Sequence, residues 1–466
     1  MLRRDLLRLF ASAPALPLGC RGSTPTQVPG PTERVVVVGA GMAGVCVAAL
    51  LGAAGIKVIV VEARDRVGGR IHTVELGGAT VDLGAAWIHG RKGNPVAGLV
   101  DGYGLATREH RYHPVRTWDA IEGREVREAE LKAALAQEGR FRATLKSLRE
   151  QLGEPASMQA AIDAHLARLG LDPRAARHAR LVLEQYMLEV DYGGPTTRTS
   201  LALFDEDDFF GDDDHLIAGG YGALIARLVQ GLDIRLNTPV ARAGVDANHA
   251  WIVTTGDERI EADRVVMTVP LGVLRAGAIT FEPALPAAKL AAIARMEPSS
   301  LEKVVLRFER VFWPIGANSA WLHIGRERGE FPLIIDFTAD AGAPMLVLLH
   351  GGSRVREVLD ICDDATLVED ARAVLAAVLG QEIPRPIASA VTRWRSDPFS
   401  LGSYSFPSLG QSMADFDALA APVASRLLFA GEATSRTYFG TVHGAVDSAR
   451  REAARLGVDS SGLPGL

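Results

Sequence analysis

Three glycines near the start of the chain have the spacing of a dinucleotide-binding turn. Gly39, Gly41 and Gly44 follow an uninterrupted apolar run at residues 35–38, which is typical of a parallel strand covered on both faces. In such a turn the first glycine permits the tight bend, the second lets backbone amides approach a pyrophosphate, and the third lets the next helix pack closely. Glu62 stands about twenty residues further on, where a carboxylate accepts hydrogen bonds from ribose hydroxyls and disfavours a 2′-phosphate. The sequence therefore predicts a bound dinucleotide other than NADP.

A glycine-rich turn that binds nothing is the alternative interpretation of this pattern. It is disfavoured because a strand precedes the turn, a helix follows it and the acid stands at the expected distance. Gly68, Gly69 and Arg70 come just beyond Glu62, and NAD binding does not require this second glycine pair. FAD is therefore the favoured cofactor.

Two kinds of pattern alternate along the rest of the chain and predict an α/β fold with discontinuous domains. Residues 34–90 have a βαβ pattern, residues 122–191 are rich in Ala, Leu, Glu and Arg at helical spacing, and residues 234–270 resemble short strands joined by polar turns. Further strands are expected at 302–312, 345–350 and 389–394, and a helix at 365–379. We expect an FAD-binding, Rossmann-like domain from residues 33–90, 216–296 and 388–460, and a discontinuous α+β substrate-binding domain from residues 91–215 and 297–387.

Composition narrows the classes of partner. The chain has 466 residues, enough for two or more domains. Its net charge of −6 gives no argument for a nucleic acid or an anionic membrane as partner. Three cysteines are too few and too poorly placed for a disulfide framework, and we expect no metal site.

The N-terminus has the pattern of an export signal of the twin-arginine kind. An arginine pair at residues 3–4 precedes an apolar stretch at residues 6–18 that is too short to span a bilayer. Cys20 stands where a lipoprotein is acylated, although Pro17 replaces the usual Leu. Residues 21–32 have the composition of a linker. We expect a periplasmic protein or a membrane-anchored lipoprotein, and the alternative is a cytoplasmic protein with an irregular N-terminus.

Several blocks in a fixed order carry a family resemblance. They are D-L-G-A-A-W-I-H-G at 82–90, G-G-Y-G-A-L-I at 219–225, T-V-P-L-G-V-L at 268–274, T-R-W-R-S-D-P-F-S-L-G-S-Y-S at 392–405, and A-G-E-A-T at 430–434 with T-V-H-G-A at 441–445. With these blocks the chain resembles the flavin-dependent amine oxidases, which include monoamine oxidases, polyamine oxidases and lysine-specific histone demethylases. The resemblance extends from about residue 35 to 456 and implies a fold of the amine oxidase type.

The resemblance assigns the cofactor-binding residues one by one. It implies that Glu62 contacts the adenosine ribose, that Arg64 and Arg70 lie in the phosphate region, and that Val240 holds the adenine end by backbone contacts. Near the flavin it implies Ala86, Trp87 and Trp394, with Glu432 near the ribityl chain and Thr441 and Val442 at a helix N-terminus that faces the flavin O2. The complete set is Gly39, Gly41, Gly44, Glu62, Arg64, Gly69, Arg70, Ala86, Trp87, Val240, Trp394, Glu432, Thr441 and Val442. Simpler alternatives are a core aromatic for Trp87 and a helix cap for Glu432.

Lys303 is the first candidate catalytic residue. Val304, Leu306 and Phe308 share one face of the expected strand, so Lys303 points to the other face. The pattern alone favours a solvated lysine on an exposed sheet face. The resemblance implies instead that this lysine holds a water against the flavin N5.

Tyr404 is the second candidate, because it matches one wall of the aromatic cage that steers an amine to the flavin. Where monoamine oxidases carry a second tyrosine this chain has Thr441, and Tyr438 is a nearby alternative for the second wall. Ser403 stands where monoamine oxidases have the cysteine that is joined to flavin. The resemblance therefore implies noncovalent FAD.

The implied reaction is oxidation of an amine. A carbon–hydrogen bond beside nitrogen gives a hydride equivalent to the flavin, the imine is hydrolysed, and O2 reoxidises the flavin with release of H2O2. Residues 205–214 are strongly acidic. They form either a solvated loop or, together with His89, a site that attracts a polycation such as spermidine.

Other functions remain open at this stage. An amino-acid oxidase is less supported, because no arginine is evidently placed for an α-carboxylate. A histone substrate is disfavoured, because neither the coiled-coil insertion nor the helical recognition domain of those enzymes is recognisable. A flavin dehydrogenase or desaturase would lack Lys303 in this strand and the W-R-S-D-P-F block, and a catalytically inactive FAD-binding protein is a further alternative. The sequence does not indicate the oligomeric state.

Overall fold

The computed structural model describes residues 33–466 except 111–112, 206–207, 209, 212, 315–318, 353, 356–357 and 359–360. The expected export signal, the linker and Cys20 lie outside these described residues, so those expectations stay predictions. Within the described part of the chain, no helix combines the length and apolar composition that a bilayer span requires.

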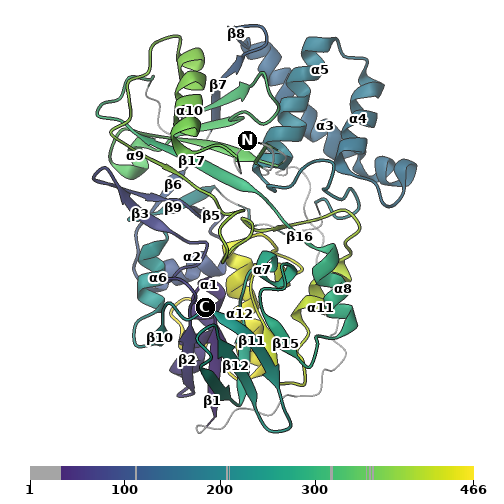
Figure 1. The fold of residues 1–466 in the computed structure, drawn as a ribbon. Coiled ribbons are helices and arrows are strands. Elements are labelled where there is room, and N and C mark those ends of the chain that lie inside the picture. Colours follow the sequence, from purple (N-terminus) through teal and green to yellow (C-terminus); the bar gives the residue numbers. More distant parts are fainter. Residues whose placement is uncertain are drawn as a thin grey trace.

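A five-stranded parallel sheet forms the lower half of the molecule in Figure 1. Its order is β10 (Asp233–Arg235), β2 (Lys57–Val61), β1 (Arg34–Val38), β14 (Arg264–Met267) and β23 (Leu427–Phe429). The apolar run of β1 is buried on both faces. On one face it packs with helices α1 (Met42–Ala53) and α12 (Val442–Arg455). The sequence-predicted Rossmann-like sheet is therefore present, and its last strand comes from the far end of the chain.

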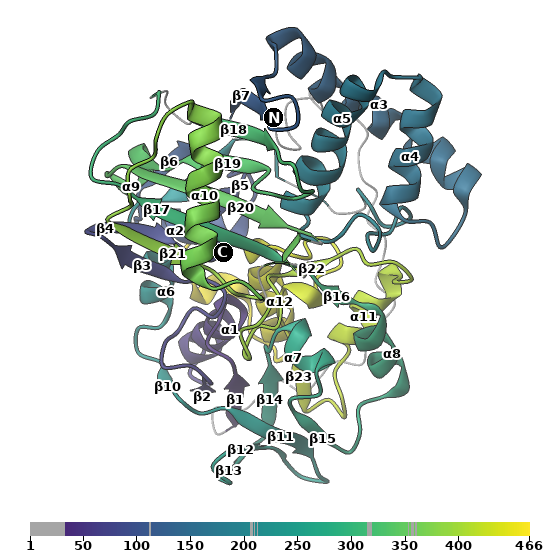
Figure 2. The same ribbon diagram turned by 45° about the horizontal axis from the view of Figure 1, so that its top comes forward.

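The other face of this sheet is covered by a second, smaller sheet. Its order is β13 (Arg259–Ala262), β12 (Ala250–Thr254), β11 (Val240–Val245) and β15 (Thr280–Glu282). Ala243, Ala250 and Ile252 of this sheet are buried with Val36 and Val38 of β1. Three short helices and a strand pair lie between this sheet and the upper half in Figure 2: α7 (Leu271–Arg275), α8 (Ala287–Arg295), α11 (Met413–Ala420), and β16 (Glu297–Pro298) with β22 (Ser405–Phe406).

A seven-stranded mixed sheet forms the upper half. Its order is β21 (Ala388–Val391), β17 (Leu301–Arg307), β20 (Met345–Gly351), β19 (Leu333–Asp336), β18 (Ser319–Ile324), β7 (His113–Asp119) and β8 (Arg124–Glu125). Helix α10 (Asp364–Leu379) lies across this sheet in Figure 2 and packs on Val304 and Leu306 of β17. Because side chains alternate along a strand, the opposite face carries Lys303. The predicted orientation of Lys303 is confirmed.

A helical block stands beside this sheet at the upper right of Figure 1. It consists of α3 (Glu128–Leu152), α4 (Met158–Leu169), α5 (Pro173–Arg180) and the π-helix η2 (Leu181–Val190). The Ser157 and Asp172 side chains cap the N-termini of α4 and α5. The predicted helical character of this block is confirmed. Helix η2 ends at Val190, and residues 191–192 follow it directly.

Small strand groups join the two halves. They are the hairpin of β3 (Thr73–Leu76) and β4 (Ala79–Asp82) and the sheet of β5 (Trp87–His89), β9 (Asp214–Ile217) and β6 (Thr107–His110). The remaining elements are α2 (Pro95–Gly102), α6 (Gly222–Leu228), α9 (Thr338–Ala341), η4 (Glu432–Thr434) and η5 (Ser460–Gly462). The expected division of the chain into domains stays a prediction. Two elements nevertheless pack with the other domain than the one to which the sequence assigned them. Strand β21 pairs with β17, so the boundary expected at residue 388 falls inside the seven-stranded sheet. Helix α2, which lies in the segment 91–215 expected in the substrate-binding domain, packs with α1 and α12 beside the parallel sheet.

Two expected strands end earlier than the sequence pattern suggested. The strand expected at 302–312 ends at Arg307, because Phe308 and Phe312 turn into an aromatic cluster with Trp313 at centroid distances of 4.8 to 5.6 Å. The strand expected at 389–394 ends at Val391. Thr392 follows, and its hydroxyl bonds to the Glu302 carboxylate at 2.6 Å.

Candidate active site

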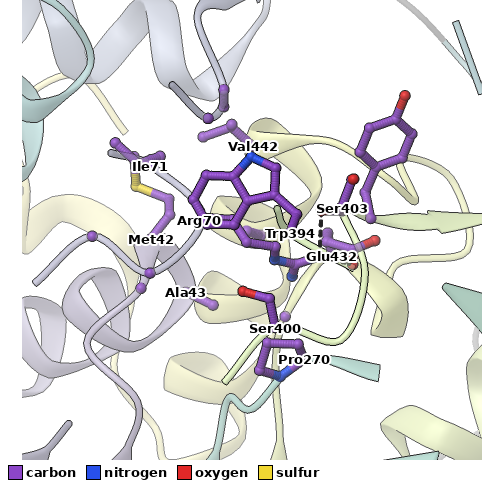
Figure 3. A pocket seen from close by; sticks show the side chains of 18 of the residues that line it. Met42, Ala43, Arg70, Ile71, Pro270, Trp394, Ser400, Ser403, Glu432 and Val442 are labelled. Atoms are coloured by element: carbon purple, nitrogen blue, oxygen red, sulfur yellow. Dashed lines mark hydrogen bonds and ion pairs between the residues drawn. The ribbon is translucent and has the colours of Figure 1, made fainter. Parts of the chain in front are cut away.

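A cavity of about 580 Å³ lies between the two halves. Every site residue predicted from the sequence lines it except Gly44, including His89, Lys303, Tyr404 and Thr441. Figure 3 shows the Arg70, Trp394 and Glu432 side chains, which come from three distant segments, around the same space. A cavity of this size is typical of a small-molecule or cofactor site. Among the described residues, no group of three or more His, Cys, Asp and Glu side chains is arranged to hold a metal ion.

The glycines of the turn differ in whether the protein itself requires glycine at their positions. A Cβ at Gly44 would lie 1.9 Å from the Gly39 carbonyl oxygen, and Gly39 has φ +105°, so both are required by the protein itself. Gly69 has φ +58° and also needs to be glycine. Gly41 is different: φ is −77°, and an added Cβ would meet only Gly68 and Gly69 at 3.9 and 4.0 Å. Nothing in the protein demands glycine at 41, which fits a ligand that approaches the turn.

Glu62 is held at the end of β2 by neighbouring backbone groups. Its carboxylate accepts hydrogen bonds from the Ala40 amide (2.7 Å) and the Arg64 amide (2.9 Å). A carboxylate has about four acceptor positions, so both oxygens can still accept from ribose hydroxyls. The Arg64 side chain turns to Asp397 (2.7 Å) and Ser400 (2.8 Å). It lines the cavity and ties residues 397–400 to the end of β2.

Arg70 and Glu432 join three segments of the cavity wall. One Arg70 nitrogen donates to Glu432 (2.9 Å) and to the Ser403 carbonyl (3.0 Å). The other Glu432 oxygen accepts from the Ser405 hydroxyl (2.6 Å) and the Gly440 amide (2.8 Å). Glu432 is therefore a buried centre of this network, and the helix-cap alternative is wrong.

Helix α12 begins at the cavity. Thr441 is its N-cap and accepts a hydrogen bond from the Gly444 amide at 2.9 Å, and Val442 is the first helical residue. The predicted helix N-terminus at this position is confirmed. The positive end of the helix dipole therefore meets the cavity, where it stabilises negative charge.

The cavity also receives Ala86, Trp87, Val240 and Trp394. Val240 begins β11, and Ala86 and Trp87 stand at the start of β5. The Trp394 indole donates a long hydrogen bond of 3.4 Å to the Leu83 carbonyl. Trp87 is half-buried and lies at the cavity wall, so it is not a simple core aromatic.

Lys303 is buried at the cavity wall, with only 5% of its surface exposed. Its ammonium group donates to the carbonyls of Asp82 (2.9 Å) and Gly84 (2.7 Å) and lies 5.1 Å from the centre of the Trp87 ring. The alternative of a solvated surface lysine is therefore wrong. Two backbone carbonyls fix the side chain and leave one N–H for a solvent molecule or ligand in the cavity.

Burial disfavours the protonated, charged form of Lys303. It lowers the pKa of Lys303 from 10.5 to about 8, and the Asp82 carboxylate acts in the opposite direction. Burial also raises the pKa of Asp82, whose carboxylate accepts hydrogen bonds from the Thr73 hydroxyl and the Tyr221 amide. Lys303 can therefore change protonation state near neutral to mildly alkaline pH.

The aromatic wall at Tyr404 is tied to the end of the helical block. The Tyr404 hydroxyl donates to the Asp191 carbonyl at 3.1 Å. Tyr438, the alternative second wall, does not line the cavity; it stacks on Phe210 with centroids 5.1 Å apart. Tyr192 and Asp191 do line the cavity, and neither was predicted from the sequence. The only available signal was their position after the helical block, where the family resemblance is least distinctive.

The acidic stretch is not a uniform solvated loop. Asp214 is buried in β9 and pairs with His89, with 3.2 Å between the ring nitrogen and the carboxylate. Asp208 lines the cavity, and the exposed Asp205 pairs with Arg142. Asp208 and Asp214 of this stretch, and Asp191 from the end of the helical block, are therefore among the residues that line the cavity.

Comparisons with known proteins agree with this geometry. The family described as flavin containing amine oxidoreductase matches residues 42–457. Among curated proteins, lysine-specific histone demethylase 1 homolog 2 of Oryza sativa subsp. japonica is 35% identical over 438 residues, which cover 91% of this chain and 56% of that protein. Polyamine oxidase 4 of the same organism is 32% identical over 455 residues, which cover 93% of this chain and 91% of that protein. The chain thus spans about half the length of the histone demethylase homologues and nearly the full length of the polyamine oxidase.

Solved structures show the same fold. Wild-type putrescine oxidase bound to putrescine superposes with a TM-score of 0.74 at 22% sequence identity, covering 91% of this chain and 98% of that one. A double mutant of putrescine oxidase gives a TM-score of 0.75 at 21% identity.

Proposed function

Because the chain belongs to the flavin-containing amine oxidoreductases, we propose that it binds FAD noncovalently and oxidises a small polyamine at a carbon beside nitrogen. One observation carries the proposal. The glycine turn, the N-terminus of α12 and the buried Lys303 all line a single cavity together with the aromatic side chains Trp87 and Tyr404.

The chemistry divides between the cofactor and the chain. FAD, when bound, would supply the two-electron acceptor for a hydride equivalent from the substrate carbon and the route of those electrons to O2, which gives H2O2. The resulting imine is hydrolysed to a carbonyl compound and an amine. The chain's own residues bind and orient the two molecules and limit access of water.

The cofactor-holding residues fit FAD. Gly41 leaves room at the N-terminus of α1, Glu62 keeps acceptor positions for ribose hydroxyls, and α12 directs its positive end to the cavity. Ser403 supports noncovalent binding, because a serine hydroxyl replaces a thiol there. This hydroxyl bonds to the Leu301 backbone, accepting from the amide (2.8 Å) and donating to the carbonyl (2.9 Å).

We assign Lys303 the task of holding a solvent molecule at the reacting centre. Its two bonds to carbonyls fix the side chain, and its third N–H is available to that solvent. The lowered pKa lets the same group exchange a proton near the working pH. Tyr404 and Trp87 present aromatic surfaces that suit an amine or its cationic form.

Three features support a polyamine over other amines. The acidic residues Asp191, Asp208 and Asp214 line the cavity, with His89 beside Asp214. The arginines that line the cavity, Arg64 and Arg70, already bind carboxylates of the protein, which disfavours an amino acid held by its α-carboxylate. The polyamine oxidase relative also matches this chain over nearly its whole length.

The N-terminal pattern supports export, and we propose that the folded protein reaches the periplasm, with Cys20 as the acylation site if it is anchored. Fractionation of a cell that expresses the full chain tests this. Protein found only in the cytoplasm, with an uncleaved N-terminus, contradicts export.

The decisive experiment is an oxidase assay on the purified protein. We expect a yellow protein that releases H2O2 with spermidine, spermine or putrescine faster than with monoamines, amino acids or a methyl-lysine peptide. Acid precipitation should leave a colourless pellet, because the flavin is not covalently bound. A colourless protein that takes up no flavin overturns the cofactor assignment. A flavoprotein that turns over none of these amines favours a binding protein or a dehydrogenase.

A further inference from the structure

The π-helix η2 ends directly at the cavity wall. Its last residue, Val190, and the two residues that follow, Asp191 and Tyr192, line the cavity. The Tyr404 hydroxyl, which also belongs to the cavity wall, donates to the Asp191 carbonyl. The position of η2 therefore sets the position of one substrate-facing wall.

Glu189 precedes this wall and is almost completely buried, with 1% of its surface exposed. It packs on the end of β20 without intervening side chains. A Cβ at Gly351 would lie 1.7 Å from the Glu189 carbonyl oxygen, and one at Gly352 would lie 2.6 Å from its Cγ. This close fit leaves the C-terminal end of η2 little room to shift against the end of β20.

Arg328 holds the Glu189 carboxylate from the loop between β18 and β19. One of its nitrogens donates to Glu189 (3.0 Å) and to the Thr196 hydroxyl (2.6 Å). Its other terminal nitrogen donates to Gln159 (3.2 Å) and lies 3.5 Å from Glu184. A single guanidinium thus connects the seven-stranded sheet to α4, to η2 and to the turn at Thr196.

The ion pair borders a small polar hollow. Glu189, Thr196, Arg328 and Arg354 line this hollow, together with Pro195, Thr197 and Glu327. Apart from Arg328, the Glu189 carboxylate has the Thr196 backbone as a weaker partner. Arg328, whose own side chain is 39% exposed, is therefore the main charged contact of the buried Glu189 carboxylate, and removing it leaves that carboxylate without its charged partner.

We propose that the Arg328–Glu189 ion pair is a positioning element that fixes the wall at residues 190–192 and so sets how tightly the amine substrate binds. Neither residue lines the main cavity, so both act through the wall. The kinetic part of this inference rests on the proposed function; the structural part does not.

Steady-state kinetics of the holoenzyme with its best amine provide the first test. Arg328→Met should raise KM about tenfold and change kcat by less than about twofold, because the wall contributes to binding rather than to the chemical step. Glu189→Gln retains an acceptor oxygen for Arg328 and should keep KM within about threefold of the wild-type value. Glu189→Met combined with Arg328→Met should be no worse than Arg328→Met alone, since the two residues act as a unit.

The matched control is Arg326→Met, which makes the same replacement two residues away in the same loop, where the arginine is exposed as Arg328 is. We expect wild-type KM. If Arg328→Met yields no folded holoenzyme, Arg328→Lys keeps the charge but loses the fork, whose one nitrogen reaches Glu189 and Thr196 while the other reaches Gln159, and should raise KM in the same direction by a smaller factor.

Amide hydrogen exchange separates this inference from the proposed function. Peptides that cover residues 186–194 should exchange faster in Arg328→Met than in wild type or Arg326→Met, whether or not any amine is oxidised. Unchanged exchange in Arg328→Met overturns the positioning role, and so does an equal rise in KM in Arg326→Met. A wild-type protein that oxidises no amine but shows the exchange difference refutes the proposed function and retains the structural part.

Discussion

The two halves of the cavity are built in different ways. On the dinucleotide side, Glu62 is held by the amides of Ala40 and Arg64, and Gly44 packs on Gly39, so the important contacts join residues close in the sequence. On the substrate side, Lys303 bonds to carbonyls more than 200 residues away. The glycine turn and Glu62 therefore form a local motif, whereas the site around Lys303 exists only after distant segments have met.

The largest expected effect tests the substrate side. Lys303→Met should slow flavin reduction or reoxidation by about 10²- to 10⁴-fold, the range for loss of a positioned proton-transfer group, while FAD stays bound. Stopped-flow measurement of both half-reactions checks this.

A second buried lysine supplies the control for Lys303. Lys289 donates to the Ala418 and Leu419 carbonyls at the end of α11 and does not line the cavity. Lys289→Met should lower stability and leave both half-reactions near their wild-type rates. Unchanged rates in Lys303→Met, or equal losses in the two variants, would refute the catalytic assignment.

The next prediction tests whether packing within the protein requires glycine at position 44 on the dinucleotide side. Gly44→Ala places a methyl group 1.9 Å from the Gly39 carbonyl oxygen, an overpacking that should cost about 3 kcal/mol. Urea unfolding of the apoprotein measures this cost. A variant with wild-type stability would show that α1 can move away from β1 freely.

Gly41→Ala sharpens the same comparison. The added methyl group meets no close protein atom, so the stability of the apoprotein should change by less than about 0.5 kcal/mol. The Kd for FAD should rise about tenfold or more, equivalent to ~1.4 kcal/mol, because the methyl group occupies space needed by the pyrophosphate. Flavin fluorescence titration gives the Kd, and wild-type affinity would contradict the expected phosphate position.

The smallest expected effect is the pH dependence of stability that Lys303 contributes. The pKa of Lys303 is about 8 in the folded protein, below its ordinary value of 10.5. Between these values the unfolded chain binds more protons, so this group makes the free energy of unfolding rise with pH, by at most ~1.4 kcal/mol per unit. Urea unfolding of wild type and Lys303→Met at several pH values isolates the term. A difference between the two proteins that does not vary from pH 8 to 10 argues against a shifted pKa.

The sequence predicted most of the dinucleotide side, because its physical requirements are local. The strand, the glycine turn and the acid at Glu62 follow one another in the chain, and the burial of β1 follows from its apolar run. The helix N-terminus at Thr441 was likewise predicted, although only through the family resemblance.

The substrate side could be predicted only in part. Alternation along β17 gave the orientation of Lys303, but its burial depends on the carbonyls of Asp82 and Gly84. The position of Asp191 at the wall depends on its contact with Tyr404, which is more than 200 residues away. On the dinucleotide side, the bond between Arg64 and Asp397 is equally remote in sequence. Residue spacing in a single sequence does not predict contacts between segments so far apart. The early end of β17 at Arg307 also could not be predicted, because it depends on aromatic packing.

Strand β23 has a consequence for biosynthesis. It is the edge of the parallel sheet, paired in register with β14 from Val265 to Met267, and the chain then proceeds directly to Glu432 and α12. A nascent polypeptide still on the ribosome cannot complete the nucleotide-binding pocket until these final segments have emerged. Flavin loading is therefore expected as a late, post-translational event, and a chain arrested before residue 427 should remain colourless even when its first βαβ unit has already folded.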